Sequence, residues 1–136
     1  MKELIFVDTN FLVGLNYPKD QYYEQVKALL LAGEGKWELL ITDYIIDEVY
    51  TGLLTKAGYF YAMNFDSDLD REVWTVVKIN DGYFQRAREV FKRFNKDKEW
   101  SFTDCTSYVV MKQLKVKKVL TFDENFGEMG FEVVGR

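Results

Sequence analysis

Short apolar runs alternate along the chain with longer segments in which apolar residues recur every three or four positions. Runs of the first kind are typical of strands that are covered on both faces, as in a parallel sheet. They occupy residues 4–7, 37–41, 73–79, 119–122 and 131–134. We therefore expect these five segments to form the strands of one sheet.

The segments with helical periodicity are bounded by start and stop signals. Residues 20–32 are followed by Gly33 and Gly35, and glycine just beyond a periodic segment commonly ends a helix. The hydroxyl of Thr42 can cap the next helix, which is expected to run to about Ala57. One predicted helix therefore lies between each pair of the first three strands.

The second half of the chain contains two more periodic segments. Residues 81–96 place five apolar side chains on one arc of the helical wheel. These side chains are Phe84, Ala87, Val90, Phe91 and Phe94. A further helix is expected from about Phe102 to about Leu114, whereas the aromatic-rich residues 58–70 fit either a helix or a loop.

Strands and helices that alternate in this way predict an α/β fold. The expected architecture is a three-layer α/β/α sandwich with a mainly parallel central sheet of about five strands. The 136 residues suit one hydrophobic core, and the chain contains no internal repeat or low-complexity segment. Residues 1–136 are therefore expected to form a single domain.

Composition narrows the chemistry that this chain can perform. Hydrophobic residues make up 48% of the sequence, which is enough to bury a core. There is no histidine, so neither a Ser-His-Asp nor a Cys-His site can be built, and the single Cys105 rules out an intramolecular disulfide. Any catalysis must rely on carboxylates, hydroxyls, lysines or a metal ion that prefers oxygen ligands.

Charge and hydropathy bear on partners and location. The net charge of −4 argues mildly against binding of nucleic acid by charge alone, but not against an acidic site that works through divalent cations. No apolar run approaches the roughly 18 residues that a membrane span needs. We expect a soluble, cytoplasmic protein with no membrane partner.

Two aspartates, Asp8 and Asp123, directly follow predicted strands. Ligands of open α/β sheets bind beyond the carboxyl ends of the strands, so these two distant residues are expected at one edge of the molecule. Each could instead simply cap the helix that follows it. The occurrence of two such residues favours a site.

Two further acids are open to more than one interpretation. Ser101 and Asp104 have the spacing of a capping box, and a first-turn acid can cap the helix and face a site at the same time. In the helix that begins near residue 43, Glu48 and Asp47 lie on opposite flanks of the apolar arc. Helical spacing cannot choose between these two.

Four segments together resemble the motifs of the PIN domain family, and in particular of its VapC-type toxins. FVDTNFLVGL resembles the first motif, and DYIIDEVYTGL resembles the second, in which the acid precedes a small apolar residue. This resemblance selects Glu48 over Asp47. SFTDCTSYVVMKQL resembles the third motif, and VLTFDENFGEMGFEVV resembles the last. The four motifs occur in order and span Asp8 to Val134.

The resemblance implies an endoribonuclease that depends on Mg²⁺ or Mn²⁺ and hydrolyses RNA phosphodiester bonds as the toxin of a toxin–antitoxin pair. Its catalytic and metal-binding residues would be Asp8, Glu48, Asp104 and Asp123. The residues expected to hydrogen-bond these carboxylates are Thr9, Asn10 and Thr121. The implied partners are RNA, an antitoxin protein and a second copy of the chain in a homodimer.

Two groups of side chains could meet these partners. The aromatic tract of Tyr59, Phe60, Tyr61 and Phe65 is either core or a face for a dimer or an antitoxin helix. Basic residues of the helix 81–96 lie opposite its phenylalanines and offer phosphate contacts, or else form a solvated face. They are Arg86, Arg88, Lys92, Arg93 and Lys96.

Other functions remain to be weighed. The chain could be a catalytically inactive PIN-fold interaction module, although all four acidic positions are filled. It could also be a PIN nuclease of RNA processing or decay that has no antitoxin. A phosphatase of the haloacid dehalogenase kind fits poorly, because the second acid it needs is replaced by Asn10. No phosphate-loop motif is present.

Overall fold

The computed structural model describes residues 1–134. Its strands are β1 (Glu3–Val7), β2 (Trp37–Thr42), β3 (Trp74–Val77), β4 (Lys118–Leu120) and β5 (Glu132–Val133). All of their pairings are parallel, and the sheet has the order β3-β2-β1-β4-β5. β1 is therefore the central strand, with β2 on one side and β4 on the other.

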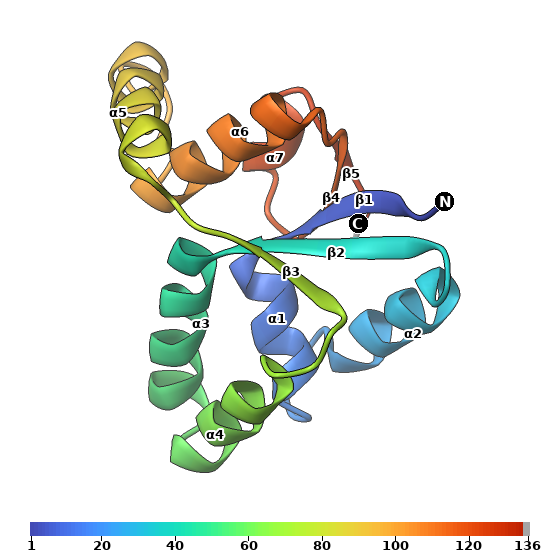
Figure 1. Ribbon diagram of the computed structural model, residues 1–136. Helices are drawn as coiled ribbons and strands as arrows, with labels where there is room; N and C mark the ends of the chain where they lie inside the picture. Colours follow the sequence, from blue (N-terminus) through green and yellow to red (C-terminus); the bar gives the residue numbers. More distant parts are fainter. Residues whose placement is uncertain (135–136) are drawn as a thin grey trace.

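Helices cover both faces of this sheet (Figure 1). One face carries α1 (Thr9–Asn16), α2 (Tyr23–Gly33), α3 (Asp43–Lys56) and α4 (Tyr59–Asp68), and the other carries α5 (Asp81–Phe94), α6 (Phe102–Leu114) and α7 (Asn125–Glu128). From β1 to β3 the chain moves across the sheet in one direction, and after β3 it crosses back to β4. Because such crossovers are right-handed, the helices that follow β3 lie on the opposite face from those that precede it. The predicted three-layer sandwich is confirmed. Within residues 1–134, no helix is long and apolar enough to cross a membrane.

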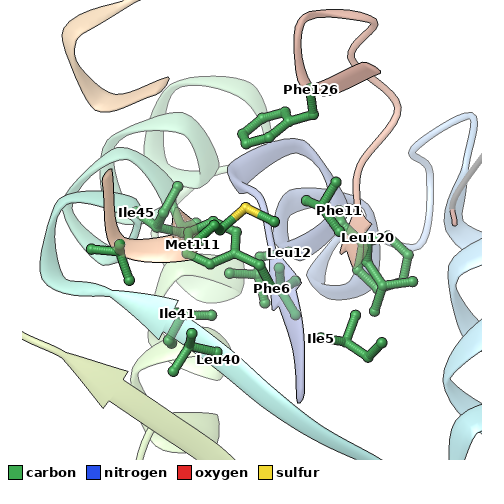
Figure 2. Close-up of a cluster of buried hydrophobic side chains, with 14 of the residues drawn as sticks. Ile5, Phe6, Phe11, Leu12, Leu40, Ile41, Ile45, Met111, Leu120 and Phe126 are labelled. Atoms are coloured by element: carbon green, nitrogen blue, oxygen red, sulfur yellow. The ribbon is translucent and has the colours of Figure 1, made fainter. Parts of the chain in front are cut away.

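The hydrophobic core lies on both sides of β1 (Figure 2). Ile5, Phe6 and Val7 are fully buried, as expected for a continuous apolar run in a central parallel strand. The rings of Phe6 and Phe126 lie 6.4 Å apart, and Met111 of α6 belongs to the same buried cluster. This packing fixes β1 firmly, which matters because the candidate site begins at the next residue.

Residues 58–70, which the sequence left open, are mostly the helix α4. Gly58 has a φ of 106°, a conformation that residues with a side chain rarely adopt, and it lets the chain turn between α3 and α4. Phe65 is fully buried and packs edge-on against Tyr50, whereas Tyr59 and Phe60 are 70% and 68% exposed. The aromatic tract is therefore divided between core and surface.

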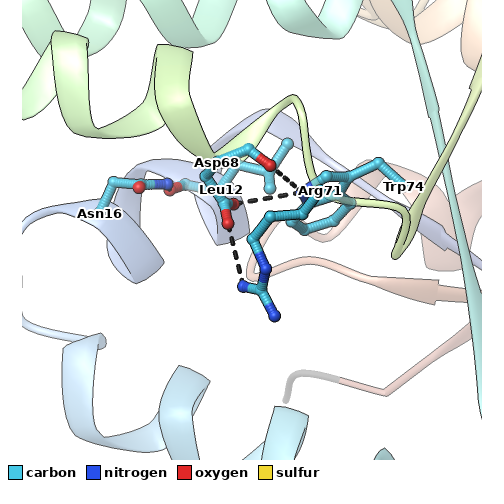
Figure 3. Close-up of polar contacts among 5 residues, drawn as sticks. All are labelled: Leu12, Asn16, Asp68, Arg71 and Trp74. Atoms are coloured by element: carbon cyan, nitrogen blue, oxygen red, sulfur yellow. Dashed lines mark hydrogen bonds and ion pairs between the residues drawn. The ribbon is translucent and has the colours of Figure 1, made fainter.

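Polar contacts hold the loop that leads from α4 into β3 (Figure 3). The indole Nε1 of Trp74 donates to the backbone oxygen of Asp68 at 3.1 Å and to its carboxylate at 3.2 Å. The same carboxylate forms an ion pair with Arg71 at 3.0 Å. At the end of α1, the side chain of Asn16 donates to the backbone oxygen of Leu12. The contacts of Asp68 thus hold Trp74, the first residue of the edge strand β3, against the end of α4.

Several elements are shorter than the apolar pattern predicts. The strand expected over 119–122 ends at Leu120, because the hydroxyl of Thr121 and the amide of Phe122 bond to side chains. The strand expected over 73–79 is confined to Trp74–Val77, and the amide of Ile79 donates to the Asp43 carboxylate at 2.9 Å. The helix expected over 81–96 ends at Phe94. The apolar pattern also assigned no boundaries to α1 or α7.

Candidate functional site

The candidate site lies at the carboxyl ends of β1 and β4. The chain crosses the sheet in one direction after β1 and in the other after β4, so these neighbouring strands form a topological switch point. Asp8 follows β1 and Thr121 follows β4, and the backbone N–H of Asp8 donates to the Leu120 oxygen at 3.0 Å. The sheet itself therefore brings two distant segments of the chain together.

Asp8 is the most buried acid of the site, with 5% of its surface exposed. The hydroxyl of Thr121 donates to its Oδ2 at 2.8 Å. Burial raises the pKa of Asp8 to about 7, the charges of Asp104 and then Asp123 add to this effect, and hydrogen bonds from Thr121 and the Thr9 backbone oppose it. Asp8 occupies the N-cap position of α1 but makes no side-chain cap bond, so the simple capping interpretation is wrong.

Asp104 combines the two roles that its sequence position allowed. The capping box is present: the Ser101 hydroxyl accepts from the Asp104 amide at 3.0 Å, and the Asp104 carboxylate accepts from the Ser101 amide at 3.3 Å. The same carboxylate also accepts from Nδ2 of Asn125 at 3.2 Å. Burial is the main cause that raises the pKa of Asp104, and the charges of Asp123 and Glu48 raise it further.

Glu48 points into the site from the second turn of α3. The hydroxyl of Thr9 donates to its Oε1 at 2.7 Å, which ties α3 to the first residue of α1. Glu48 is partly buried, whereas Asp47 is exposed. The choice of Glu48, which helical spacing alone left open, agrees with this placement.

Asp123 lies in the turn between β4 and α7. Its amide donates to the Thr121 hydroxyl at 3.0 Å, and its Oδ1 accepts from the Asn125 amide at 2.9 Å. The second bond satisfies the amide of the first residue of α7, although the N-cap position of this helix belongs to Glu124 and not to Asp123. Asp123 also raises the pKa of both Asp8 and Asp104 and is therefore electrostatically part of the site.

Two asparagines organise the site in ways that the sequence did not reveal. The sequence predicted a hydrogen bond from Asn10 to a carboxylate, and this prediction is wrong. The Oδ1 of Asn10 instead accepts from the Phe122 amide at 3.1 Å and from the Thr121 hydroxyl at 3.3 Å. Asn125, which was not singled out, donates to Asp104 and to Asp123. The only signal in the sequence was an amide side chain two residues after Asp123.

A divalent cation fits the chemistry of this cluster. Among residues 1–134, no three acidic or thiol groups are already positioned to hold one ion jointly. The donor atoms are nevertheless all carboxylate oxygens, oriented by hydroxyl and amide groups, and Mg²⁺ and Mn²⁺ prefer such ligands. The four side chains would have to draw closer around an ion, which would also offset the repulsion that raises the pKa of Asp8 and Asp104.

An open cleft of about 840 Å³ adjoins the carboxylates at Asp123. Its lining comes from α1, α2 and the segment after β4, and includes aromatic, amide and acidic side chains. They are Asn10, Tyr22, Gln25, Phe122, Asp123, Glu124, Asn125 and Glu128. The carboxylate cluster is thus one end of a larger surface that can accept a ligand.

The predicted basic face of α5 makes contacts within its own layer. Arg86 donates to the side chain of Gln113 at 2.8 Å, Arg88 donates to Gln85, and Lys92 forms an ion pair with Glu89 at 3.4 Å. α5 packs on α6, and within residues 1–134 its basic side chains make no hydrogen bond or ion pair with Asp8, Glu48, Asp104 or Asp123. RNA binding by this face stays a prediction.

Comparison with known proteins identifies the family. The sequence model of the PIN domain family matches residues 5–132 of this chain. A VapC ribonuclease from Archaeoglobus fulgidus is 32% identical over 123 residues, which cover 88% of this chain and 77% of that protein. The 23S rRNA-specific endonuclease VapC20 of Mycobacterium tuberculosis is 26% identical, covering 94% of this chain and 95% of its own.

Solved structures agree with this assignment. The crystal structure of Mycobacterium tuberculosis VapC20, a Sarcin-Ricin loop cleaving toxin, aligns with a TM-score of 0.87 at 26% identity, over 96% of this chain and 98% of that chain. FitAcB from Neisseria gonorrhoeae aligns with a TM-score of 0.66 at 18% identity over 95% of each chain, a similarity that concerns the fold alone. By its match to the family model over residues 5–132 and its 32% identity to a VapC ribonuclease, this chain belongs to the PIN domain family.

Proposed function

We propose that this protein is an endoribonuclease and the toxin of a VapBC-type toxin–antitoxin pair. The observation that carries the proposal is the convergence of Asp8, Glu48, Asp104 and Asp123 at the switch point of a PIN-domain sheet. Relatives that match most of this chain include a VapC ribonuclease and a 23S rRNA-specific endonuclease, which supports RNA as the substrate class.

The reaction would be hydrolysis of a phosphodiester bond with Mg²⁺ or Mn²⁺. Asp8 and Asp104 would hold the cation, and Glu48 and Asp123 would complete the shell directly or through water. When bound, the ion supplies the Lewis acidity that activates water and offsets charge developing on the phosphate. No histidine is needed for this chemistry, in keeping with the composition.

Neighbouring side chains keep the carboxylates in position before any ligand arrives. The Thr121 hydroxyl holds Asp8, the Thr9 hydroxyl holds Glu48, and the Asn125 amide holds Asp104. Such partners of metal-ligating residues commonly affect metal affinity 10- to 100-fold. Asp8 lies in a buried environment of low dielectric constant, which strengthens its charge interactions with Asp104 and Asp123.

Cleavage of total RNA with mapping of the new ends tests the enzymatic proposal. We expect discrete cleavage sites with Mn²⁺ or Mg²⁺, none in EDTA, and loss of most cleavage in Asp8→Asn. Ribosomal RNA should be inspected first, because one relative is specific for 23S rRNA. Asp47→Asn, which removes an exposed acid next to Glu48, is the matched control and should cleave normally. An Asp8→Asn protein that cleaves at the wild-type rate in EDTA would overturn the mechanism.

The protein is further proposed to act in the cytoplasm, to form a homodimer and to bind an antitoxin. Leu54, Tyr59 and Phe60 leave large apolar surfaces exposed around the turn between α3 and α4, and such surfaces commonly receive a partner helix. Light scattering tests the dimer, and co-purification with the product of an adjacent gene tests the antitoxin. A monomer at high concentration that retains no second protein contradicts both.

Two alternative functions of a protein with this fold predict different outcomes of these experiments. An inactive interaction module would bind no Mn²⁺ in isothermal titration calorimetry and would cleave no RNA. A PIN nuclease of RNA processing or decay would bind metal and cleave RNA, but would have no antitoxin partner. The filled acidic positions and the hydrogen bonds that orient them favour an active enzyme.

A further inference from the structure

We propose that the cleft beside Asp123 recognises an unpaired guanine base of the RNA substrate. This inference rests on the proposed function and adds which base the enzyme reads. The cleft measures about 840 Å³, so it has room for a purine ring. Contacts to the phosphate backbone carry no sequence information, so an enzyme that distinguishes RNA sequences directly reads the edges of bases.

One wall of the cleft is aromatic. The rings of Tyr22 and Phe122 stack with their centroids 3.9 Å apart and their planes within 8°, and Phe122 also stacks on Phe11 at 5.8 Å. Because Tyr22 and Phe122 line the cleft, a nucleobase there can extend a row of rings that the protein has already ordered. Stacking on aromatic side chains is a common way in which proteins hold unpaired bases of RNA.

The remaining wall is polar and acidic. Asp123, Glu124 and Glu128 line the cleft, and its described lining contains no lysine or arginine. A cation lies next to it at Lys98, which forms an ion pair with Glu128 at 3.3 Å. Carboxylates repel a phosphate but accept hydrogen bonds from N–H groups. The charge of the cleft therefore favours an uncharged ring that carries N–H donors.

Guanine satisfies this requirement better than the other bases. Its Watson–Crick edge presents the N1–H and the N2 amino group side by side, and one carboxylate can accept from both. Adenine and cytosine present only an amino group on that edge, and uracil presents only N3–H. We therefore expect the cleft to prefer guanine over the other three bases.

The cleft and the carboxylate cluster are physically continuous. Asp123 belongs to both, and Asn10, which lines the cleft, accepts a hydrogen bond from the same Thr121 hydroxyl that donates to Asp8. The Oδ1 of Asn10 also accepts from the amide of Phe122, which fixes the aromatic wall relative to the acids. A base in the cleft would thus belong to a nucleotide beside the phosphate that is cut.

The test measures binding of short RNAs to the wild-type protein in EDTA, where neither metal nor cleavage contributes. Fluorescein-labelled hexauridylates that carry one guanosine, inosine, adenosine or no substitution are compared by fluorescence anisotropy. Inosine lacks only the N2 amino group, so we expect it to bind about tenfold less tightly than guanosine. Equal affinity for guanosine and inosine, or no binding of either, would overturn the proposal.

Variants locate the binding site. Tyr22→Ala should weaken binding of the guanosine RNA by at least about fivefold, and Tyr22→Phe should restore it, because the phenyl ring keeps the stack. The control, Leu31→Ala, removes a 72% exposed side chain from α2 and should change nothing. If Leu31→Ala and Tyr22→Ala have the same effect, the guanine does not lie in the cleft.

A competing occupant is an arginine side chain of a partner protein, which also presents paired N–H donors on a planar group. Displacement of the RNA by arginine amide but not by guanosine would overturn the proposal.

The same RNAs incubated with Mn²⁺ test guanine recognition by the cleft and the proposed nuclease activity separately. Selective guanine binding without any cleavage supports the cleft and contradicts the nuclease. Cleavage that treats guanosine and inosine alike contradicts the cleft and leaves the nuclease standing.

Discussion

The side-chain amide of Asn125 donates to Oδ2 of Asp104 at 3.2 Å, while the backbone amide of the same residue donates to Oδ1 of Asp123 at 2.9 Å. A single residue at the start of α7 therefore connects two acids that belong to different motifs. The hydrogen bond from Asn125 lowers the pKa of Asp104 and so opposes the effect of burial, which raises it. Asn125 keeps Asp104 closer to the charged form that a cation requires.

Replacing Asn125 by alanine should weaken metal binding without removing a ligand. We expect the Mn²⁺ dissociation constant, measured by isothermal titration calorimetry, to rise roughly tenfold or more. The acidic limb of the pH–activity profile should move to higher pH, because the pKa of Asp104 loses a contribution that lowers it. Asn64→Ala removes an exposed amide from α4 and serves as control. Unchanged affinity and an unchanged profile would exclude a positioning role.

The stability of the metal-free protein should fall as pH rises from about 4 to above 7. The pKa of Asp8 is raised from 3.8 to about 7 on folding, so the folded protein binds this proton more tightly than the unfolded chain. Its contribution is complete below pH 4 and is lost as pH passes 7, a change on the order of 4 kcal/mol. Urea unfolding in EDTA at pH 5 and pH 8 measures it. Asp8→Asn should flatten this dependence, and a wild type that gains stability over the same interval would contradict the prediction.

Asp104→Asn should raise the melting temperature in EDTA and lower the response to metal. The substitution removes a charge that raises the pKa of Asp8, at the cost of a weakened capping box worth about 1 kcal/mol. We expect the relief of repulsion to exceed that cost. Metal at a hundred times its dissociation constant should stabilise the wild type by roughly 2.7 kcal/mol and the variant far less. Thermal melting at pH 7.5 with EDTA and with Mn²⁺ measures both. If metal does nothing for the wild type and the variant melts earlier in EDTA, Asp104 is only a cap.

Thr121→Val should damage both stability and activity. The Thr121 hydroxyl is fully buried; it donates to Asp8 and accepts from the amide of Asp123. Valine fills the same space but leaves those groups unpaired, which should cost roughly 1–3 kcal/mol in urea unfolding. The pKa of Asp8 should rise further, so RNA cleavage at neutral pH should also fall. Thr121→Ser retains the hydroxyl and should behave nearly like the wild type. A valine variant of normal stability and activity would show that the hydroxyl is dispensable.

The layers of the fold could be predicted because its strands are continuous apolar runs and most helices carry their own boundary signals. Thr42, for example, caps α3 by accepting from the Ile45 amide, as its position before the helix indicated. The pattern failed where polar side chains interrupt it. The apolar pattern predicts that the strand continues through Thr121 and Phe122. In the structure these residues hydrogen-bond to the side chains of Asp8 and Asn10, and the strand ends before them.

Asp8 and Asp123 could be singled out because each follows a strand, and Asp104 because it lies in the first turn of a helix, whereas Glu48 was selected over Asp47 only by the resemblance to the PIN domain motifs. Their hydrogen-bond partners could not all be found in this way. Asn125 reaches Asp104 across 21 positions of sequence, a relationship that depends on how α7 docks beside α6 and not on local spacing. Periodicity likewise put Phe84 and Phe91 of α5 on one arc with Ala87, but only Ala87 is buried. The arc is wider than the surface that α6 covers.

The central position of β1 has a consequence for the moment at which the protein becomes active. β1 is made first, but its neighbour β4 and the Thr121–Asp8 bond join residues 113 positions apart. Contacts of such separation form late, because a long loop must close before they stabilise anything. A growing chain that has not yet released Thr121 from the ribosome has no complete acidic cluster. Synthesis itself thus delays the complete acidic cluster until the segment that follows β4 has emerged.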